Sequence, residues 1–359
     1  MSDVEFAVNG RFLTQNITGV QRYARNVVLH LDEILKARST SAPIFAPHTA
    51  LDPELERMPL VKIGRVTGHA WEQFVLPMRW NGHLLNLCNT APALKSKQVV
   101  CIHDANVYIK PESYSFAFKA YYRFLQFLIA RGSAKITTVS SNSAAQIAEH
   151  LSLDYSQIIV LPNGHEHALT WKPELAKTAP SIIARPDGTR ERPFVLAIGS
   201  QAEHKNLRLV TDIAPNLYEL GIDTIIAGGS AAIFSPHTSS NIKNVSFLGR
   251  IDDNDLAFLM DRALCLLFPS WTEGFGLPIV EAMARNCPVV SSDRASMPEI
   301  CGRAALIAAP DDPRKWVEHV TTLVEDPTRR TELILSGRER VKQFSWHRTA
   351  EAYADLIRD

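Results

Sequence analysis

The chain contains 359 residues, of which 46% are hydrophobic and 21% are charged, and its 38 basic and 38 acidic side chains cancel. At about 150 residues per domain, this length predicts two domains. The balanced charge argues against a nucleic-acid-binding protein, which usually carries a basic excess. Because no run of about 18 apolar residues occurs, the sequence also predicts no transmembrane helix.

The five cysteines are widely spaced, lie among apolar or small residues, and form no CxxC pair. We therefore expect buried free thiols rather than a disulfide scaffold or a zinc site. The opening residues, MSDVEFAVNGRF, lack the basic-then-apolar order of a secretory signal. Together these features predict a cytoplasmic protein.

Short apolar segments alternate with helical patterns along both halves of the chain, which is typical of parallel sheets covered on both faces. Residues 172–193 are rich in Pro, Gly and charge and indicate a linker between the halves. The expected strands are 4–8, 98–102, 135–139, 158–161, 194–199, 223–229, 245–249, 265–270 and 288–293. The expected helices lie near 20–35, 112–131, 142–151, 205–220, 253–263, 278–286 and 346–358.

The fold class that this pattern predicts is α/β, with two doubly wound Rossmann-like domains facing a central cleft. We expect the first domain at residues 1–175 and the second at 176–343. A C-terminal helix within 344–359 is expected to cross back to the first domain. Ligands of such sheets bind beyond the carboxyl ends of the strands, so the loops after the strands are the candidate ligand sites.

The most informative of these loops lies in FPSWTEGFGLPIVEAM, residues 268–283. A strand is expected to end near Phe268, and Pro278 suits the first turn of the helix that follows. The backbone N–H groups of Phe275, Gly276 and Leu277 should then point outward from a helix N-terminus. Such an end binds phosphate well, and Gly276 allows a ligand to approach the backbone.

Two carboxylates, Glu273 and Glu281, bracket this turn. Carboxylates accept hydrogen bonds from hydroxyl groups, so the combination suits a polyhydroxylated phosphate ester such as a nucleotide sugar. Alternatively, Glu281 caps its helix and Glu273 is a solvated loop residue. The accompanying strand, glycines and proline favour the functional interpretation.

EGFGLPIVE, together with the flanking FPS, PVVSSD and MPEI, resembles the family 4 retaining glycosyltransferases of GT-B fold. Further matching segments follow the same order along the chain: TGVQRYARNV, CIHDANVYIKPESY, TTVSSNSA, LPNG, AIGSQAEHKNL and VSFLGRIDD. The resemblance covers essentially the whole chain. It implies a GT-B fold and transfer of a sugar from a nucleotide-sugar donor. It also implies that the first domain binds the acceptor and the second domain binds the nucleotide sugar.

The resemblance implies roles for three residues of the second half. Glu273 would contact the hydroxyls of the donor sugar, Glu281 the ribose, and Lys205 the diphosphate. Independently, Lys205 follows the strand that ends at Gly199, where a cation can neutralise the leaving diphosphate. Taken alone, Lys205 could equally be a solvated surface lysine.

The sequence departs from the family pattern where an arginine often accompanies this lysine. Ser200 and His204 occupy those positions here. Neutralisation of the phosphates is therefore expected to rest on Lys205 with His204, or with Arg250.

The first half supplies three further candidates. Gly19 opens a helix whose N–H groups could meet the donor phosphate, although a bare N-cap at Thr18 is the alternative. His103 and Asp104 follow the strand 98–102. By resemblance, His103 approaches the donor sugar and the reaction centre, so the expected catalytic residues are His103, Lys205 and Glu273.

Residues 253–255 spell Asp-Asn-Asp, the pattern of metal-dependent glycosyltransferases of the other major fold. We interpret them as a helix start, where Asp is favoured, and expect a metal-independent reaction.

Residues 113–131 contain seven aromatic and three basic side chains and no acidic one, and Lys119 and Arg123 should share a helical face. One interpretation is a half-buried helix that packs on the N-terminal sheet. The alternative is a peripheral contact with the inner face of the plasma membrane, because aromatic and basic side chains suit a lipid interface. A lipid-linked acceptor would favour the second interpretation.

The hypothesis that follows is a hexosyltransferase that needs no cofactor. It transfers a hexose, mannose being one candidate, from GDP-mannose or a UDP-sugar to a hydroxyl of a glycan or lipid-linked acceptor in polysaccharide biosynthesis. The alternatives are a sugar-nucleotide epimerase or hydrolase on the same fold, or a non-catalytic binding protein.

Overall fold

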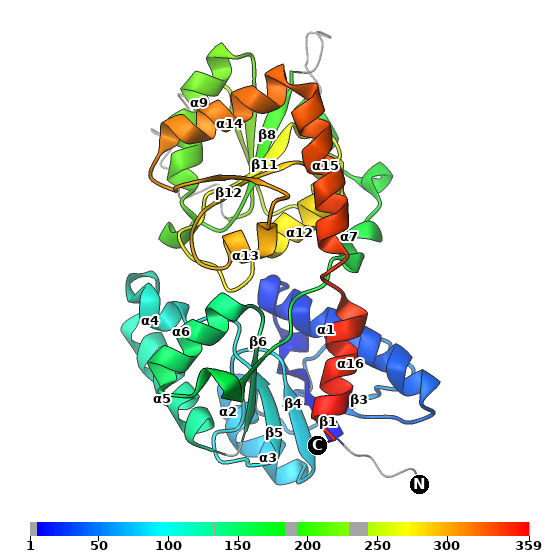
Figure 1. Ribbon diagram of the computed structural model, residues 1–359. Helices are drawn as coiled ribbons and strands as arrows, with labels where there is room; N and C mark the ends of the chain where they lie inside the picture. Colours follow the sequence, from blue (N-terminus) through cyan, green and yellow to red (C-terminus); the bar gives the residue numbers. More distant parts are fainter. Residues whose placement is uncertain (1–5, 133, 184–191, 230–242, 359) are drawn as a thin grey trace. The chain divides into compact units, whose positions relative to one another are not determined.

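The computed structural model describes residues 6–132, 134–183, 192–229 and 243–358. Their contacts divide the chain into two compact units. The first unit consists of two segments, one that ends at Gly164 and one that begins at Ser345, and the second unit is His165–Phe344. Each unit contains one parallel sheet between helices (Figure 1).

The first sheet has seven parallel strands in the order β3-β2-β1-β4-β5-β6-β7. Its strand order reverses between β1 and β4, which pair directly. This is the topological switch point at which ligands bind in open α/β sheets. The strands are β1 (Phe6–Asn9), β2 (Ile44–Ala46), β3 (Leu60–Lys62), β4 (His83–Asn86), β5 (Gln98–Cys101), β6 (Lys135–Thr138) and β7 (Ile158–Val160).

Helices cover both faces of this sheet (Figure 1). The longer ones are α1 (Gly19–Ala37), α5 (Phe116–Arg131), α6 (Ser141–Leu151) and α16 (Trp346–Leu356). The shorter segments are η1 (Gly10–Thr14), α2 (Gly68–Ala70), the π-helix η2 (Trp71–Val75), α3 (Leu76–Arg79), α4 (Asn106–Ile109), η3 (Pro111–Ser113) and η4 (Tyr155–Gln157).

The C-terminal helix α16 packs on α1 within the first unit. The hydroxyl of Tyr353 lies 3.0 Å from that of Tyr23 on α1 and 2.8 Å from that of Thr137 on β6. At the same, C-terminal end of α16, Lys135 donates a hydrogen bond to the carbonyl of Leu356. Because buried hydroxyls need partners, these contacts fix the helix to the sheet.

The second sheet has six parallel strands in the order β10-β9-β8-β11-β12-β13, with its switch point between β8 and β11. The strands are β8 (Phe194–Ile198), β9 (Asp223–Ala227), β10 (Val245–Gly249), β11 (Cys265–Phe268), β12 (Val289–Ser292) and β13 (Leu306–Ala308). The helices are α7 (Glu166–Leu169), η5 (Pro173–Leu175), α8 (Ala179–Ile183), η6 (Glu203–Lys205), α9 (Leu207–Glu219), α11 (Asp253–Met260), α12 (Leu277–Ala284), α13 (Met297–Cys301), α14 (Pro313–Glu325) and α15 (Pro327–Val341).

The boundary between the units falls at Gly164, earlier than the 175 that the sequence predicted. The reason lies in the packing of the following segments, because α7 contacts α12 and α8 contacts α11. In addition, the carboxylate of Asp255 accepts hydrogen bonds from the backbone N–H groups of Lys177, Thr178 and Ala179. Residues 172–183 of the expected linker are therefore packed within the second unit, and its residues 184–191 lie outside the described ranges.

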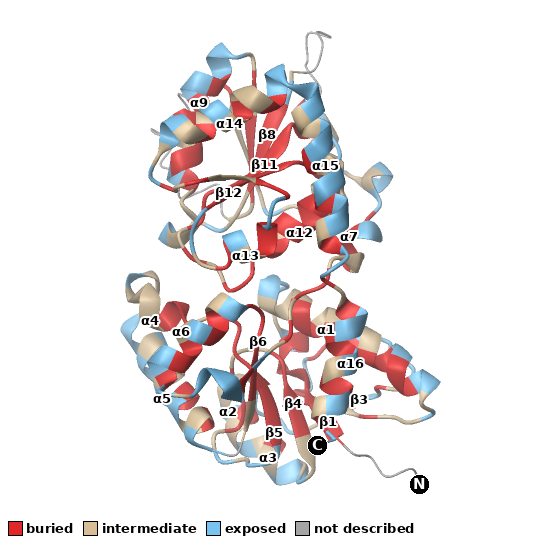
Figure 2. Cartoon of the chain, in the orientation of Figure 1, coloured by how far each residue is buried: buried red, intermediate tan, exposed pale blue. Residues whose placement is uncertain are grey.

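The inner strands of each sheet are buried, as Figure 2 shows, and most are apolar on both faces. The edge strands β3, β7, β10 and β13 are only partly buried. All five cysteines are free thiols, and four of them are buried. None of the helices in the described ranges is long and apolar enough to cross a bilayer.

Candidate active site

An ion pair between Lys205 and Glu273 lies at the switch point of the second sheet. Lys205 ends η6 after β8, and Glu273 lies in the loop after the adjacent strand β11. The Nζ of Lys205 donates to both carboxylate oxygens of Glu273, at 2.7 Å and 2.9 Å. Their side chains are 21% and 12% exposed, so the pair is largely buried yet reachable. The structure therefore joins two of the three predicted catalytic residues.

The loop that carries Lys205 is held firmly against the loop after β11. The stem of Lys205 packs beside Gly199, where a Cβ would lie in ordinary van der Waals contact, 3.4 Å from the lysine Cβ. The N–H of Trp271 donates to the carbonyl of His204 at 2.7 Å. Asn206, with a φ of 52°, donates its amide to the carbonyls of Pro269 and Pro310. The side chain of Lys205 is therefore already positioned before a ligand binds, and binding costs little free energy for reorganising the site.

Contacts with Ser296 and Phe344 hold the turn before α12 in place. The hydroxyl of Ser296 lies 3.0 Å from the carbonyl oxygens of both Glu273 and Phe275. The ring of Phe275 packs edge-on against Phe344 at 5.4 Å. Gly276 has a φ of 95°, a backbone conformation that residues with a side chain rarely adopt, which explains the glycine at this position.

The helix start differs in one respect from the sequence prediction. Phe275, Gly276 and Leu277 are buried residues, so the turn is less open than predicted. Their backbone N–H groups nevertheless donate no hydrogen bond to any residue in the described ranges. Pro278 occupies the first turn of α12 as predicted. Buried donors without partners at a helix N-terminus are suited to an anionic ligand.

Glu281, which the resemblance assigns to the ribose, lies buried in α12 and contacts a histidine. Its Oε1 is 2.9 Å from Nε2 of His167 on α7. The imidazole of His167 in turn packs edge-on against Trp171 at 5.4 Å. Sequence analysis did not identify His167, because nothing in HEHALTW indicates a partner 114 residues away.

The two candidate cations beside Lys205 lie at different places. His204 precedes Lys205 within η6 and is half-buried. Arg250 is exposed and follows β10, the edge strand, which β9 separates from β8. The strand order therefore favours His204 as the neighbour of Lys205.

The Asp-Asn-Asp segment performs the structural task that the sequence suggested, with one shift. Asp252 is the N-cap of α11, where its carboxylate accepts the N–H of Asp255 at 2.8 Å. Asp253 and Asp255 lie in the first turn. Among the described residues no three His, Cys, Asp or Glu side chains gather as a metal site would need. Metal independence stays a prediction.

His103 is buried at the carboxyl end of β5 in the first unit. Its Nε2 lies 2.8 Å from the carbonyl of Leu87, and its ring packs edge-on against Tyr23. Burial alone would lower the pKa of His103, but the neighbouring Cys101 and the Leu87 carbonyl outweigh burial and raise it. Its predicted contact with the donor sugar stays a prediction.

Asp104 and Gly19 also lie in the first unit. Asp104 accepts the backbone N–H of Asn106 at 2.9 Å, which starts the short helix α4. Gly19 is the exposed first residue of α1, and a Cβ there would meet nothing within 4 Å. Thr18 caps the helix in a capping box with Gln21, so the N-cap expected as the alternative is present.

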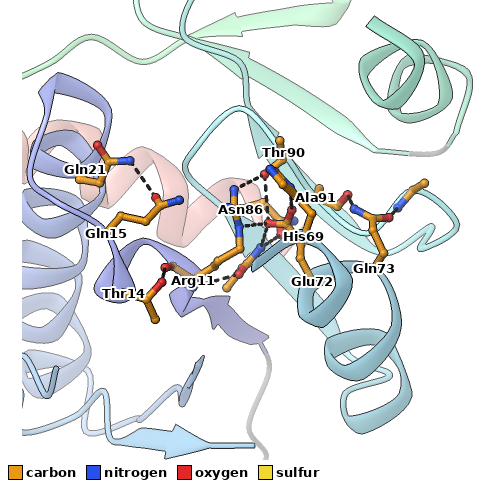
Figure 3. A network of polar contacts seen from close by, with 12 residues as sticks. Arg11, Thr14, Gln15, Gln21, His69, Glu72, Gln73, Asn86, Thr90 and Ala91 are labelled. Carbon is orange, nitrogen blue, oxygen red and sulfur yellow. Dashed lines mark hydrogen bonds and ion pairs between the residues drawn. The ribbon is translucent and has the colours of Figure 1, made fainter. Parts of the chain in front are cut away.

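A second polar cluster, which the sequence did not reveal, lies at the switch point of the first sheet (Figure 3). Glu72 of the π-helix accepts hydrogen bonds from Asn9, Arg11 and Thr90. Asn9 also donates to Asn86 at 2.9 Å. The signal available in the sequence was the pair of polar residues, Asn9 and Arg11, directly after the first strand.

The fold is that of the GT-B glycosyltransferases. The chain superposes on the crystal structure of WaaG, a glycosyltransferase involved in lipopolysaccharide biosynthesis, with a TM-score of 0.71, 16% identity and 98% of both chains covered. Anabaena Alr3699/HepE in complex with UDP-glucose gives a TM-score of 0.70 at 17% identity, again with 98% of both chains covered.

Within this fold, residues 192–326 match the model of the family Glycosyl transferases group 1. The O-antigen chain mannosyltransferase RfbU of Salmonella typhimurium is 27% identical over 243 residues, which cover 67% of this chain and 64% of the relative. The MMP alpha-(1->4)-mannosyltransferase of Mycolicibacterium hassiacum is 30% identical over 242 residues, 63% of this chain and 54% of the relative. The matched segments thus span less than two thirds of these relatives.

Proposed function

We propose that the protein transfers a hexose from a nucleoside-diphosphate sugar to a hydroxyl of a glycan or lipid-linked acceptor in polysaccharide assembly. The observation that carries this proposal is the Lys205–Glu273 pair at the carboxyl edge of the second sheet. It combines a cation for a diphosphate with a carboxylate for sugar hydroxyls, within a group 1 glycosyltransferase domain.

The proposed reaction needs a group that stabilises the departing diphosphate. As the bond between the anomeric carbon and the diphosphate oxygen breaks, negative charge grows on that oxygen. Lys205, already oriented by Glu273, supplies the matching positive charge, and such preorganised charges are often the largest contribution to catalysis. The backbone N–H groups of Phe275, Gly276 and Leu277 offer further donors to the phosphates.

The acceptor oxygen then forms the new bond to the anomeric carbon, and its proton passes to the departing diphosphate oxygen. This front-face displacement retains the configuration of the sugar, as the resemblance to the retaining family implies. Glu273 binds the hydroxyls of the sugar ring and is not required as a nucleophile. A bound donor would share the hydrogens of Lys205 with Glu273, because the ammonium has three donors.

Mannose is our leading donor sugar, because two relatives are named as mannosyltransferases. The structure of HepE with UDP-glucose makes a UDP-sugar the second candidate. A sugar-nucleotide hydrolase or epimerase is the alternative, and it predicts turnover of the donor without an acceptor.

Thermal shifts with a panel of GDP-, UDP- and dTDP-sugars test the proposal. We expect one donor to raise the melting temperature, because a ligand that binds only the folded state at 100 times its Kd adds about 2.7 kcal/mol of stability. The matching nucleoside monophosphate should give a smaller shift, since it lacks the second phosphate that Lys205 would bind. Absence of a shift with every donor would contradict the proposal.

We further propose that α5 contacts a membrane surface. The exposed side chains of Phe116, Phe124 and Phe127 lie at spacings of eight and three along this helix, which places them on one face. Arg131 follows one turn later, with its guanidinium 5.1 Å from the centre of the Phe127 ring. Aromatic and basic side chains on one helical face suit an anionic lipid interface.

The basic face that the sequence predicted is only partly present. Arg123 does not extend beside Lys119 into solvent, because it donates two hydrogen bonds to the carbonyl of Val107 and lies over the ring of Tyr108. The exposed phenylalanines therefore carry more of the proposed contact than the cations do.

Replacing Phe116, Phe124 and Phe127 together by serine should lower the bound fraction on phosphatidylglycerol vesicles about tenfold or more. The physical reason is that each phenylalanine fully buried in an apolar phase contributes about 1.5–3 kcal/mol. A matched control replaces three exposed leucines elsewhere, Leu51, Leu175 and Leu335. Co-sedimentation measures both variants, and an equal loss in the control would contradict the contact through α5.

A further inference from the structure

The polar cluster of the first sheet is built around one buried carboxylate. Glu72 is 1% exposed and lies in a π-helix, a form that is rare and frequent at functional sites. Its Oε1 accepts hydrogen bonds from Asn9 at 2.8 Å, from Arg11 at 3.1 Å and from Thr90 at 3.1 Å. Its Oε2 makes no hydrogen bond within the described ranges, and Nδ1 of His69 lies 3.4 Å from it.

His69 links this buried carboxylate to the surface. Its side chain is 35% exposed, and it lies one turn before Glu72, close to the carboxylate (Figure 3). Gly68 beside it borders open space, because a Cβ built there meets nothing within 4 Å. If the cluster only held strands β1 and β4 together, Glu72, Asn9 and Arg11 would be sufficient. The half-exposed imidazole of His69 would have no part in that structural role.

Two tyrosines of α5 pack against the same imidazole. The ring centres of Tyr121 and Tyr122 lie 4.7 Å and 5.7 Å from that of His69. Tyr122 is also stacked on Phe118 at 4.0 Å, which fixes its ring. The hydroxyl of Tyr121 is buried and makes no hydrogen bond of normal geometry within the described ranges, although the side chain of Gln73 lies near it. A buried hydroxyl with such a weak contact can still donate a hydrogen bond to a ligand or to water, or accept one from it.

We propose that His69, Tyr121 and Tyr122 bind a sugar ring of the acceptor, with Glu72 as the residue that positions His69. A pyranose ring has an apolar face and a rim of hydroxyls. Aromatic rings with a polar group at one end match both parts, and ligand sites usually combine apolar walls with a few fixed polar groups. The location at the switch point between β1 and β4 is where open α/β sheets bind ligands.

This inference rests on the proposed function, because it assigns the acceptor of that reaction. The donor groups Lys205 and Glu273 belong to the second sheet, whereas the three binding residues belong to the first. The two sites can therefore be tested by separate ligands. The probes we choose are methyl α-mannoside, methyl α-glucoside and methyl N-acetyl-β-glucosaminide, because each has one sugar ring and no phosphate.

Saturation-transfer NMR of the full chain with these three glycosides tests the site. We expect at least one glycoside to bind the wild type, and His69→Ala and Tyr122→Ala each to weaken its Kd about tenfold, which is about 1.4 kcal/mol. Phe127→Ala is the matched control, since it removes an exposed ring from the same helix. It should leave glycoside binding unchanged.

Glu72→Gln tests the positioning role. It keeps the size of the side chain but removes the charge that faces His69, so glycoside binding should weaken about tenfold. The thermal shift with the nucleotide-sugar donor should stay as in the wild type. Because Glu72→Gln also weakens the buried pair with Arg11, the melting temperature of the free protein should fall under either role. A merely structural role would lower it without a selective loss of glycoside binding. Tyr121→Phe serves as a milder variant, because it removes only the hydroxyl.

The outcomes separate the two proposals. If the donor raises the melting temperature but no glycoside binds the wild type, the acceptor site is wrong and the proposed function stands. If Phe127→Ala weakens binding as much as Tyr122→Ala, the acceptor site is also wrong. If a glycoside binds through His69 and Tyr122 but no donor shifts the melting temperature, the site stands as a carbohydrate site and the proposed transfer is wrong.

Discussion

Replacing Lys205 by alanine is expected to lower the rate of sugar transfer about 10²- to 10³-fold, the usual loss when one preorganised electrostatic group is removed from a reaction centre. The loss should fall on kcat, because the charge on the diphosphate grows as the glycosidic bond breaks. Rates of nucleoside-diphosphate release at saturating donor and acceptor measure it. A variant that retains more than half of the wild-type rate would contradict the role of Lys205.

Arg208 provides a matched control for the Lys205 variant. Arg208 lies three residues further along, in the first turn of α9, and its side chain is 89% exposed. Arg208→Ala removes the same charge from the same segment and should leave the rate nearly unchanged. Lys205→Arg retains the charge but changes its shape, so we expect an intermediate rate. If Arg208→Ala lost as much activity as Lys205→Ala, the effect would come from net charge and not from the site.

Replacing Glu72 by alanine is expected to destabilise the protein by about 3–5 kcal/mol, because it leaves the buried guanidinium of Arg11 without its partner. Arg11 and Glu72 are 7% and 1% exposed, and Asn9 and Thr90 also lose an acceptor. Guanidinium unfolding of the variant measures the loss.

The control for this variant is Glu56→Ala. Glu56 pairs with Lys36, and both side chains are more than half exposed, so the unfolding midpoint should change little. An equal shift of the midpoint in both variants would contradict the contribution assigned to the buried pair.

The dependence of folding stability on pH follows from the contacts of Glu72. Burial alone would raise the pKa of Glu72, but the nearby imidazole of His69 and the charge of Arg11 outweigh burial and hold it below its ordinary value of 4.5. A carboxyl group whose pKa is lower in the folded state stabilises the fold above its unfolded-state pKa. This contribution should therefore be complete above pH 4.5 and disappear as the pH falls through the lower folded-state value. Glu72→Ala should flatten the acid side of the stability curve.

The second sheet could be predicted well because its pattern is local. Strands β8 to β12 are apolar runs that end in recognisable loops, and the strand, Gly-x-Gly and Pro order of residues 268–278 folds as the sequence indicated. The three-residue strand β13, by contrast, was not expected. Lys205 and Glu273 lie 68 residues apart, yet each follows a strand of the predicted sheet. Neighbouring parallel strands bring their carboxyl ends together, and the pair follows from that rule.

The first sheet could be predicted only in part. Strands β2 and β3 have three residues each, and β4 has four. Runs this short carry no period that separates them from a loop. With β4 missing, the switch point between β1 and β4 could not be located, so the cluster around Glu72 was not expected.

Two contacts could not be predicted from the sequence, because they depend on tertiary packing alone. Glu281 meets His167 because α7 packs on α12, and no spacing within either helix indicates that partner. Asp255 binds the N–H groups of residues 177–179, which moves the boundary between the units toward Gly164. Side chains that bind a distant backbone leave little trace in a sequence.

A crystal structure of the chain with bound UDP or GDP tests the central claim most directly. The account predicts that a diphosphate oxygen lies within about 3.2 Å of Nζ of Lys205, a normal hydrogen-bond distance. It also predicts phosphate oxygens against the backbone N–H groups of Phe275, Gly276 and Leu277. A diphosphate bound at another edge of the sheet, with Lys205 still paired only to Glu273, would contradict it.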